Sequence, residues 1–143
     1  MIRRFICLGL PLLMVLFFSG CADHIVSECD KTEDKNTTLF PITFMEIQKN
    51  LFDRSCAVPG CHSGATPEAN LSLTAGLSYK NIVNVISRQN PDLKIVLPGN
   101  SSQSYLIKKL EGYNTSVMPP AGKLESALID SVTAWIDRGA LKN

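Results

Sequence analysis

The stretch Cys56-Ala57-Val58-Pro59-Gly60-Cys61-His62 carries more chemical information than any other part of the chain. Two thiols followed directly by an imidazole are what covalent haem attachment requires, because each thiol adds to a vinyl group of the porphyrin and the histidine ligates the iron. The common form is C-x-x-C-H, whereas four residues separate these cysteines. Pro59 and Gly60 favour a turn. We therefore expect the extra residues to bulge and both thiols to reach the vinyl edges.

A c-type haem in an electron carrier needs a second axial ligand, commonly a methionine thioether. Met118 is the methionine downstream of the motif, in the loop sequence Val117-Met118-Pro119-Pro120. Prolines stiffen such a loop, so the sulfur can be presented at a small ordering cost. The alternative is that Met118 fills a gap in the core. Met45 lies in a helical pattern upstream of Cys56, where we expect a core role.

The first twenty residues have the features of an export signal. Arg3 and Arg4 precede an apolar run over residues 5–18, and Ser19-Gly20-Cys21 follows. A membrane-spanning helix needs about 20 apolar residues, so this run is short for one. The end of the run resembles a bacterial lipobox, which implies cleavage before Cys21 and stable anchoring by its acyl chains. The alternatives are an ordinary signal peptide cleaved nearby and a start-anchored transmembrane helix.

We expect three parts in the chain of 143 residues: a lipoprotein signal peptide at 1–20, a flexible polar tether at 21–40, and one domain at 41–143. The tether is rich in acidic and other polar residues and has little apolar content. With 14 Lys and Arg against 13 Asp and Glu, the chain is too neutral for a nucleic-acid binder. The predicted location is the cell envelope, in the periplasm or on the outer face of a bacterial membrane.

In the domain, apolar residues at helical spacing alternate with Pro and Gly. The pattern predicts an all-α domain of about four short helices with long loops and no strand. The expected boundary residues are Thr43, Ser78, Ser101 or Ser102, Gly112 and Arg138-Gly139. The expected apolar faces are Phe44, Ile47, Leu51 and Phe52; Ile82, Val83 and Ile86; Tyr105, Leu106 and Leu110; and Leu124, Leu128, Val132, Trp135 and Ile136. Loops this long need something to pack against, which a cofactor would supply.

From about Phe44 to Ala140 the chain resembles a single-haem cytochrome c domain, and is especially similar to the cytochrome c-like domains typified by planctomycete proteins. The matching pieces, in the family's order, are Cys61-His62-Ser63-Gly64, Leu71-Ser72-Leu73, Val96-Leu97-Pro98-Gly99-Asn100, Ser104-Tyr105-Leu106, Lys109-Leu110-Glu111-Gly112, Met118-Pro119-Pro120 and Ala134-Trp135-Ile136-Asp137-Arg138-Gly139-Ala140. The resemblance implies a cytochrome c-like fold whose first and last helices cross beside one covalent haem c. It implies Cys56 and Cys61 as attachment points, His62 as proximal ligand and Met118 as distal ligand.

The function expected from this resemblance is outer-sphere electron transfer by an exported, lipid-anchored cytochrome. The domain itself turns over no substrate, so it is not expected to be an enzyme. Redox proteins and, through the lipid anchor, the membrane are the expected partners. Lys108, Lys109 and Lys123 are candidates for a docking patch, although lysines more often form a solvated face.

Two other interpretations of the cysteines remain open. Cys56 and Cys61 can form a disulfide in a haem-free exported binding or structural module, since an oxidising compartment permits it. A zinc site would take Cys29, Cys56, Cys61 and His62, but adjacent Cys and His ligands fit poorly around a tetrahedral ion. Cys29 has no evident partner in the sequence.

Overall fold

The computed structural model describes residues 42–143. The expected signal peptide, the lipidation site Cys21, the tether and Cys29 lie outside the described residues. The elements are α1 (Phe44–Ile47), which continues into the π-helix η1 (Gln48–Cys56), then the 3-10 turn η2 (Glu68–Asn70), α2 (Ser78–Ile82), α3 (Tyr105–Glu111) and α4 (Ser126–Asp137). The described residues form helices and a few isolated bridges but no strand. The predicted all-α class is therefore confirmed.

The first helix begins where the sequence predicts. Thr43 is extended, and its hydroxyl oxygen accepts a hydrogen bond of 3.2 Å from the backbone N–H of Glu46, which makes it the N-cap. Asn143 also contributes, since its side-chain and backbone oxygens accept bonds from the N–H groups of Phe44 (3.0 Å) and Met45 (3.1 Å). The end of the chain thereby pairs amides that the first turn of a helix leaves free.

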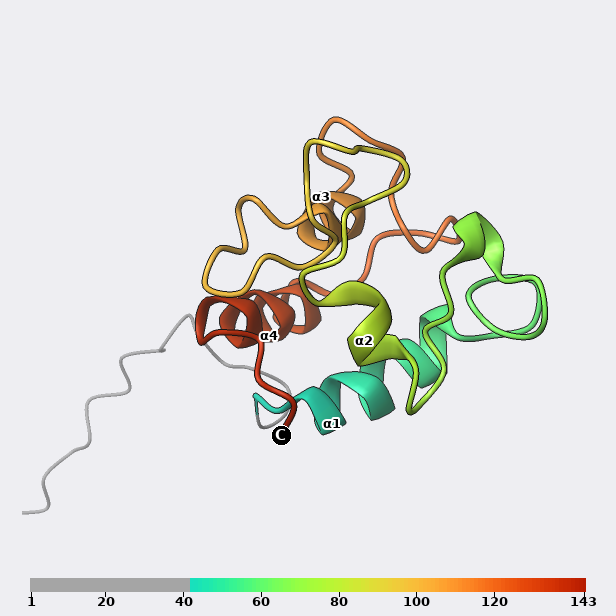
Figure 1. Cartoon of the computed structure of the whole chain (residues 1–143), viewed down its shortest axis with the longest axis horizontal. Helices are drawn as coiled ribbons and strands as arrows, with labels where there is room; N and C mark the ends of the chain where they lie inside the picture. The colour runs from blue at the N-terminus through green and yellow to red at the C-terminus, as the bar shows by residue number, and fades with distance from the viewer. Residues whose placement is uncertain (1–41) are drawn as a thin grey trace, which may run out of the picture. The chain divides into compact units, whose positions relative to one another are not determined.

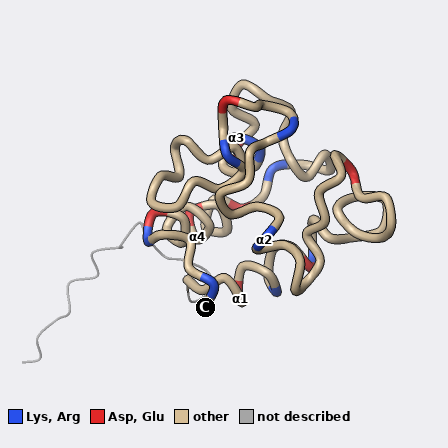
Figure 2. Tube along the Cα trace, in the orientation of Figure 1, with Lys and Arg blue, Asp and Glu red and all other residues tan. Residues whose placement is uncertain are grey.

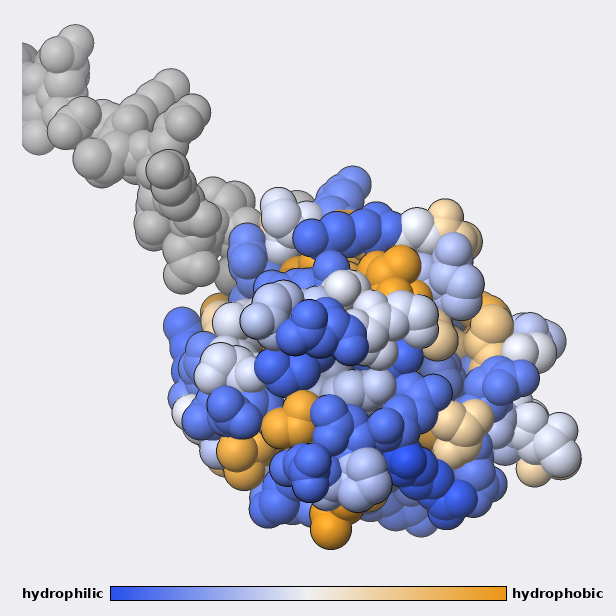
Figure 3. Space-filling view, turned by 90° about the horizontal axis from the view of Figure 1, so that it is seen from above, coloured by the Kyte–Doolittle hydropathy of each residue, from blue (hydrophilic) through white to orange (hydrophobic). Residues whose placement is uncertain are grey.

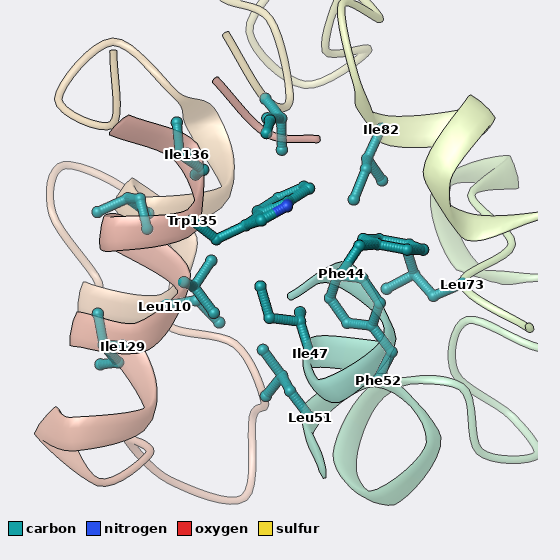
Figure 4. Packing of buried hydrophobic residues seen from close by; sticks show 14 residues of the cluster. Phe44, Ile47, Leu51, Phe52, Leu73, Ile82, Leu110, Ile129, Trp135 and Ile136 are labelled. Atoms are coloured by element: carbon teal, nitrogen blue, oxygen red, sulfur yellow. The ribbon is translucent and has the colours of Figure 1, made fainter. Parts of the chain in front are cut away.

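The core forms where α1 and η1 meet α4 (Figure 4). Phe44 lies at its centre, with ring centroids at 5.5 Å from Trp135, 5.0 Å from Tyr79 and 6.3 Å from Phe52. Trp135 is buried, and its indole N–H donates to the backbone oxygen of Leu141 at 2.9 Å. The predicted apolar faces of the first and last helices therefore pack against each other.

The boundaries of α3 (Tyr105–Glu111) and α4 (Ser126–Asp137) agree with the sequence predictions at their C-terminal ends. Gly112 closes α3 with a φ of 72°, as predicted. The start of α3 is Tyr105, not Ser101 or Ser102, because residues 101–104 form a turn in which the N–H of Ser104 donates to Ser101 O at 2.9 Å. The last helix ends at Asp137, and Gly139 follows with a φ of 100°, as the end signals predicted.

Three further sequence expectations are wrong. Met45 is 68% exposed, because the buried face of its helix is already formed by neighbours on the other side. Ile86 is 61% exposed, since α2 ends at Ile82 and helical spacing no longer applies beyond it. Ser78 does not cap α2; it is fully buried, and its hydroxyl bonds to the side chain of Gln48.

Long connections wrap this helical centre. The connection 83–104 joins α2 to α3 (Figure 1), and parallel and antiparallel bridges at Val83–Val96, Ile86–Lys94 and Lys94–Ser104 order it. Figure 3 shows a mainly hydrophilic face with small separate apolar patches. Within residues 42–143 no helix has the length and apolar character to span a membrane.

We expect Phe44→Ala to lower the free energy of unfolding by about 3–5 kcal/mol, because it empties the aromatic centre between the first and last helices. The neighbouring variant Met45→Ala is the matched control and should change it by less than about 0.5 kcal/mol, since that side chain is exposed. Urea denaturation followed by tryptophan fluorescence measures both. Equal effects of the two substitutions would contradict this packing.

Candidate functional site

The Cys56–His62 loop is a closed turn at the end of η1. The N–H of Cys61 donates to Val58 O at 3.0 Å, with Pro59 and Gly60 between them and Gly60 at a φ of 79°. This is the arrangement of a turn with proline second and glycine third. The N–H of His62 then donates to Cys56 O at 3.0 Å and closes the whole loop. The predicted turn at Pro59 and Gly60 is confirmed.

Both cysteines are half-buried free thiols. Burial, and to a smaller extent the neighbouring Cys61, raises the pKa of Cys56 from 9.0 to about 12. The thiol of Cys56 is therefore protonated throughout the physiological range. The turn, closed by the bond from the His62 N–H to Cys56 O, brings the two cysteines close together along the chain.

Three polar contacts fix His62. Its N–H bonds to Cys56 O, its backbone oxygen accepts from the N–H of Leu73 at 2.9 Å, and its Nδ1 lies 3.1 Å from Leu71 O. A carbonyl oxygen only accepts, so this contact requires the proton on Nδ1. In the tautomer with the proton on Nδ1, the Nε2 lone pair can bind a metal ion, and this is how proteins orient a ligating imidazole.

Met118 lies in the loop between α3 and α4 and is tied to α3, whereas the cysteines and His62 follow η1. Its N–H donates to Lys109 O at 2.8 Å, at the end of α3, and the side chain is half-buried. Gly112 allows this fold-back, because a Cβ at that position would lie 3.2 Å from the Cβ of Val117. In Figure 1 the loop after α3 extends toward residues 57–70 before it returns to α4. Among the described hydrogen bonds, none joins Met118 to the Cys56–His62 loop.

A cavity of about 550 Å³ lies directly before the first cysteine. It is lined by Asn50, Arg54 and Ser55 of η1 and by Lys123, Leu124, Glu125 and Leu128 from the start of α4 and the residues before it. The segment that follows Met118 and its prolines thus reaches the end of η1. The lining of the cavity combines two leucines with the charged side chains of Arg54, Lys123 and Glu125.

The three lysines proposed for docking have different surroundings. Lys108 lies over the ring of Tyr113 (5.1 Å to the centroid), and Lys109 lies over Tyr105 (5.7 Å). Lys109 also donates to the backbone oxygen of Ser116 at 3.4 Å and so helps to hold the Met118 loop. Positive and negative residues are interspersed along the trace in Figure 2. A docking role for these lysines stays a prediction.

Leu71 is the site residue that sequence reasoning did not assign. It occurs in the Leu71-Ser72-Leu73 piece of the family resemblance, but the group that acts is its backbone oxygen, which no side-chain pattern reveals. Among residues 42–143, no three His, Cys, Asp or Glu side chains converge as a metal cluster would require. The zinc interpretation also needs Cys29, which lies outside the described residues.

Comparison with protein-family models, with curated proteins and with solved structures gave no match for this chain.

In the haem-free, reduced protein we expect iodoacetamide to modify Cys61 well before Cys56 at pH 8. The alkylating species is the thiolate, and a pKa near 12 leaves very little of it on Cys56. Raising the pH toward 11 should narrow the difference, and urea should abolish it. Peptide mass spectrometry over a time course measures both sites. Equal rates in the folded protein would contradict the burial of Cys56.

Proposed function

We propose that this protein is an exported, lipid-anchored c-type cytochrome that transfers electrons through one covalent haem c bound by a cytochrome c-like domain. The observation that carries the proposal is the state of His62, which directly follows two thiols, is held by three contacts and has its Nδ1 satisfied by Leu71 O. An imidazole held in this way through Nδ1 offers its Nε2 nitrogen as the ligand, as second-shell hydrogen bonds do for ligating histidines. The resemblance of the sequence to cytochrome c-like domains supports the same conclusion.

The donor set fits a covalently attached haem. Cys56 and Cys61 are free thiols brought into one region by a tight turn, so each is available for a thioether bond. His62 offers its Nε2 nitrogen and Met118 a thioether, the pair that gives cytochromes c their closed, six-coordinate iron. The cavity next to Ser55 offers apolar surface close to the attachment loop.

Each residue has a separate part in the mechanism. Bound haem supplies a one-electron couple between Fe(II) and Fe(III). Cys56 and Cys61 would hold the ring covalently, and His62, with its orientation set by the bond to Leu71, would ligate the iron. Met118, tied to α3 through Lys109, would supply a soft ligand that favours the ferrous form. With His62 and Met118 both as ligands, electron transfer would require little reorganisation.

The rest of the proposal concerns location and partners. Lipid on Cys21 would anchor the protein in the cell envelope, with residues 22–40 as a spacer between the membrane and the domain. Donor and acceptor would be redox proteins that approach the haem edge. The domain would act as a carrier and not as an enzyme, because His62 and Met118 would both ligate the iron.

The full chain, exported by cells that attach haem, should carry covalent haem. On a denaturing gel it should retain haem peroxidase staining, and its intact mass should be raised by one haem. Cys56→Ser and Cys61→Ser should each leave a single thioether and weaken the staining, and the double variant should lose it. A colourless wild type with a Cys56–Cys61 disulfide in its peptide map would overturn the proposal in favour of the haem-free module.

Met118→Ala should remove the weak near-infrared band of sulfur bound to ferric iron, lower the reduction potential, and open the ferrous iron to carbon monoxide. Met45→Ala is the matched control, because Met45 is exposed on α1, and it should change none of these. Visible and near-infrared spectra with carbon monoxide titration measure the effect. If the wild-type ferrous protein already binds carbon monoxide readily, the carrier assignment gives way to a haem enzyme or sensor.

A further inference from the structure

The segment 71–73 has each of its carbonyl oxygens occupied by a side chain from elsewhere in the fold. Leu71 O accepts from His62 Nδ1 (3.1 Å), Ser72 O from the Asn81 amide (2.8 Å), and Leu73 O from the Gln48 amide (3.0 Å). The segment belongs to no helix or strand. Its position is therefore set by these contacts and by its backbone bonds, and not by a regular ladder.

Gln48 is a buried residue with both ends of its amide paired. It is 8% exposed; its Nε2 donates to Asp53 Oδ1 (2.6 Å) as well as to Leu73 O, and its Oε1 accepts from the hydroxyl of Ser78. A reversed amide would set an oxygen against a carboxylate and a carbonyl. The amide orientation is thus fixed, and Gln48 joins η1, α2 and the 71–73 segment at one point.

Asn81 approaches the same segment from α2. Its Nδ2 donates to Ser72 O, between the two carbonyls used by His62 and Gln48. Two helices separated in sequence therefore hold one short piece of loop. Leu73 also donates its N–H to the backbone oxygen of His62, so a shift of the segment would move His62 at two points.

We propose that Gln48 and Asn81 are positioning residues for His62: the two amides hold Leu71-Ser72-Leu73 so that Leu71 O keeps the proton of the imidazole on Nδ1. The inference rests on the proposed function in that it gives His62 the role of an iron ligand. The chain of contacts itself needs no haem. Outer-sphere hydrogen bonds of this kind set the tautomer and ring orientation of ligating histidines and their loss weakens the site. In this protein the acceptor, Leu71 O, is itself held in place by two further side chains, Gln48 and Asn81, which bond to the neighbouring carbonyls of the same segment.

We call the contacts of Gln48 and Asn81 with residues 71–73 the clamp. Its effect on His62 can be measured directly as the rate of solvent exchange of the His62 Nδ1 proton. In the full-length wild-type chain, selectively labelled with ¹⁵N-histidine, this proton should exchange slowly because its acceptor is fixed. Gln48→Met removes both amide donors at nearly constant length, and Asn81→Leu removes the donor to Ser72. Each should accelerate exchange by up to about 10-fold, the factor that corresponds to the loss of one hydrogen bond holding the acceptor.

Asn50→Leu is the matched control. Asn50 lies on the same helix as Gln48, and its amide donates to Glu46 Oε2 at 2.8 Å without touching the 71–73 segment. It should leave the exchange of the His62 proton at the wild-type rate. Backbone amide exchange in α4 serves as the check that every variant keeps its fold.

Unchanged exchange in folded Gln48→Met and Asn81→Leu would overturn the clamp. If Gln48→Met does not fold, the half-buried Asn81 gives the decisive variant, and Ser78→Ala tests the Gln48 arm by removing the partner of Oε1. The outcome is separable from the proposed function. A protein that carries no haem but shows the clamp effect refutes the cytochrome and keeps the inference, whereas a haem-loaded protein with unaffected exchange does the reverse.

Discussion

The hydrogen bond between His62 Nδ1 and Leu71 O is the interaction on which the site depends. It fixes the tautomer of the one histidine that follows the two cysteines, and it leaves the opposite nitrogen available as a ligand. Other parts of the fold position both the donor, His62, and the acceptor, Leu71 O. The π-helix η1 delivers Cys56 and closes the turn that carries His62, while Gln48 and Asn81 hold the segment that supplies the acceptor.

The aromatic centre between α1, η1 and α4 makes this arrangement rigid. Phe44, Phe52 and Trp135 fix the axis of the helix that ends at Cys56, and Asn143 pairs the amides at its start. The cost of ordering the long loops is offset by bonds to backbone oxygens at their turning points, such as Met118 N–H to Lys109 O. Stability and site geometry therefore share the same residues at the beginning and end of the domain.

Short-range patterns in the sequence predicted several helix ends, one helix face and one turn. The Thr43 cap, the stop at Gly112, the face of the last helix and the Pro59-Gly60 turn all follow from residues a few positions apart, and all are confirmed. Met45 and Ile86 were misplaced because periodicity alone does not give the end of α2 or the width of the buried face. Gln48 and Leu71 were missed for another reason. Their contacts span 25 and 9 residues and use backbone oxygens, which leave no trace in side-chain spacing.

The visible absorption spectrum of the full chain, purified from cells that export it and attach haem, tests the central claim most directly. The account predicts a c-type spectrum with a sharp pair of bands in the dithionite-reduced form. The pigment should stay with the protein after acid–acetone extraction, because thioether bonds retain it. Replacement of His62 by alanine should abolish the low-spin bands and leave the covalent pigment. A wild-type protein that is colourless, or whose pigment is extracted by acid–acetone, would contradict the account.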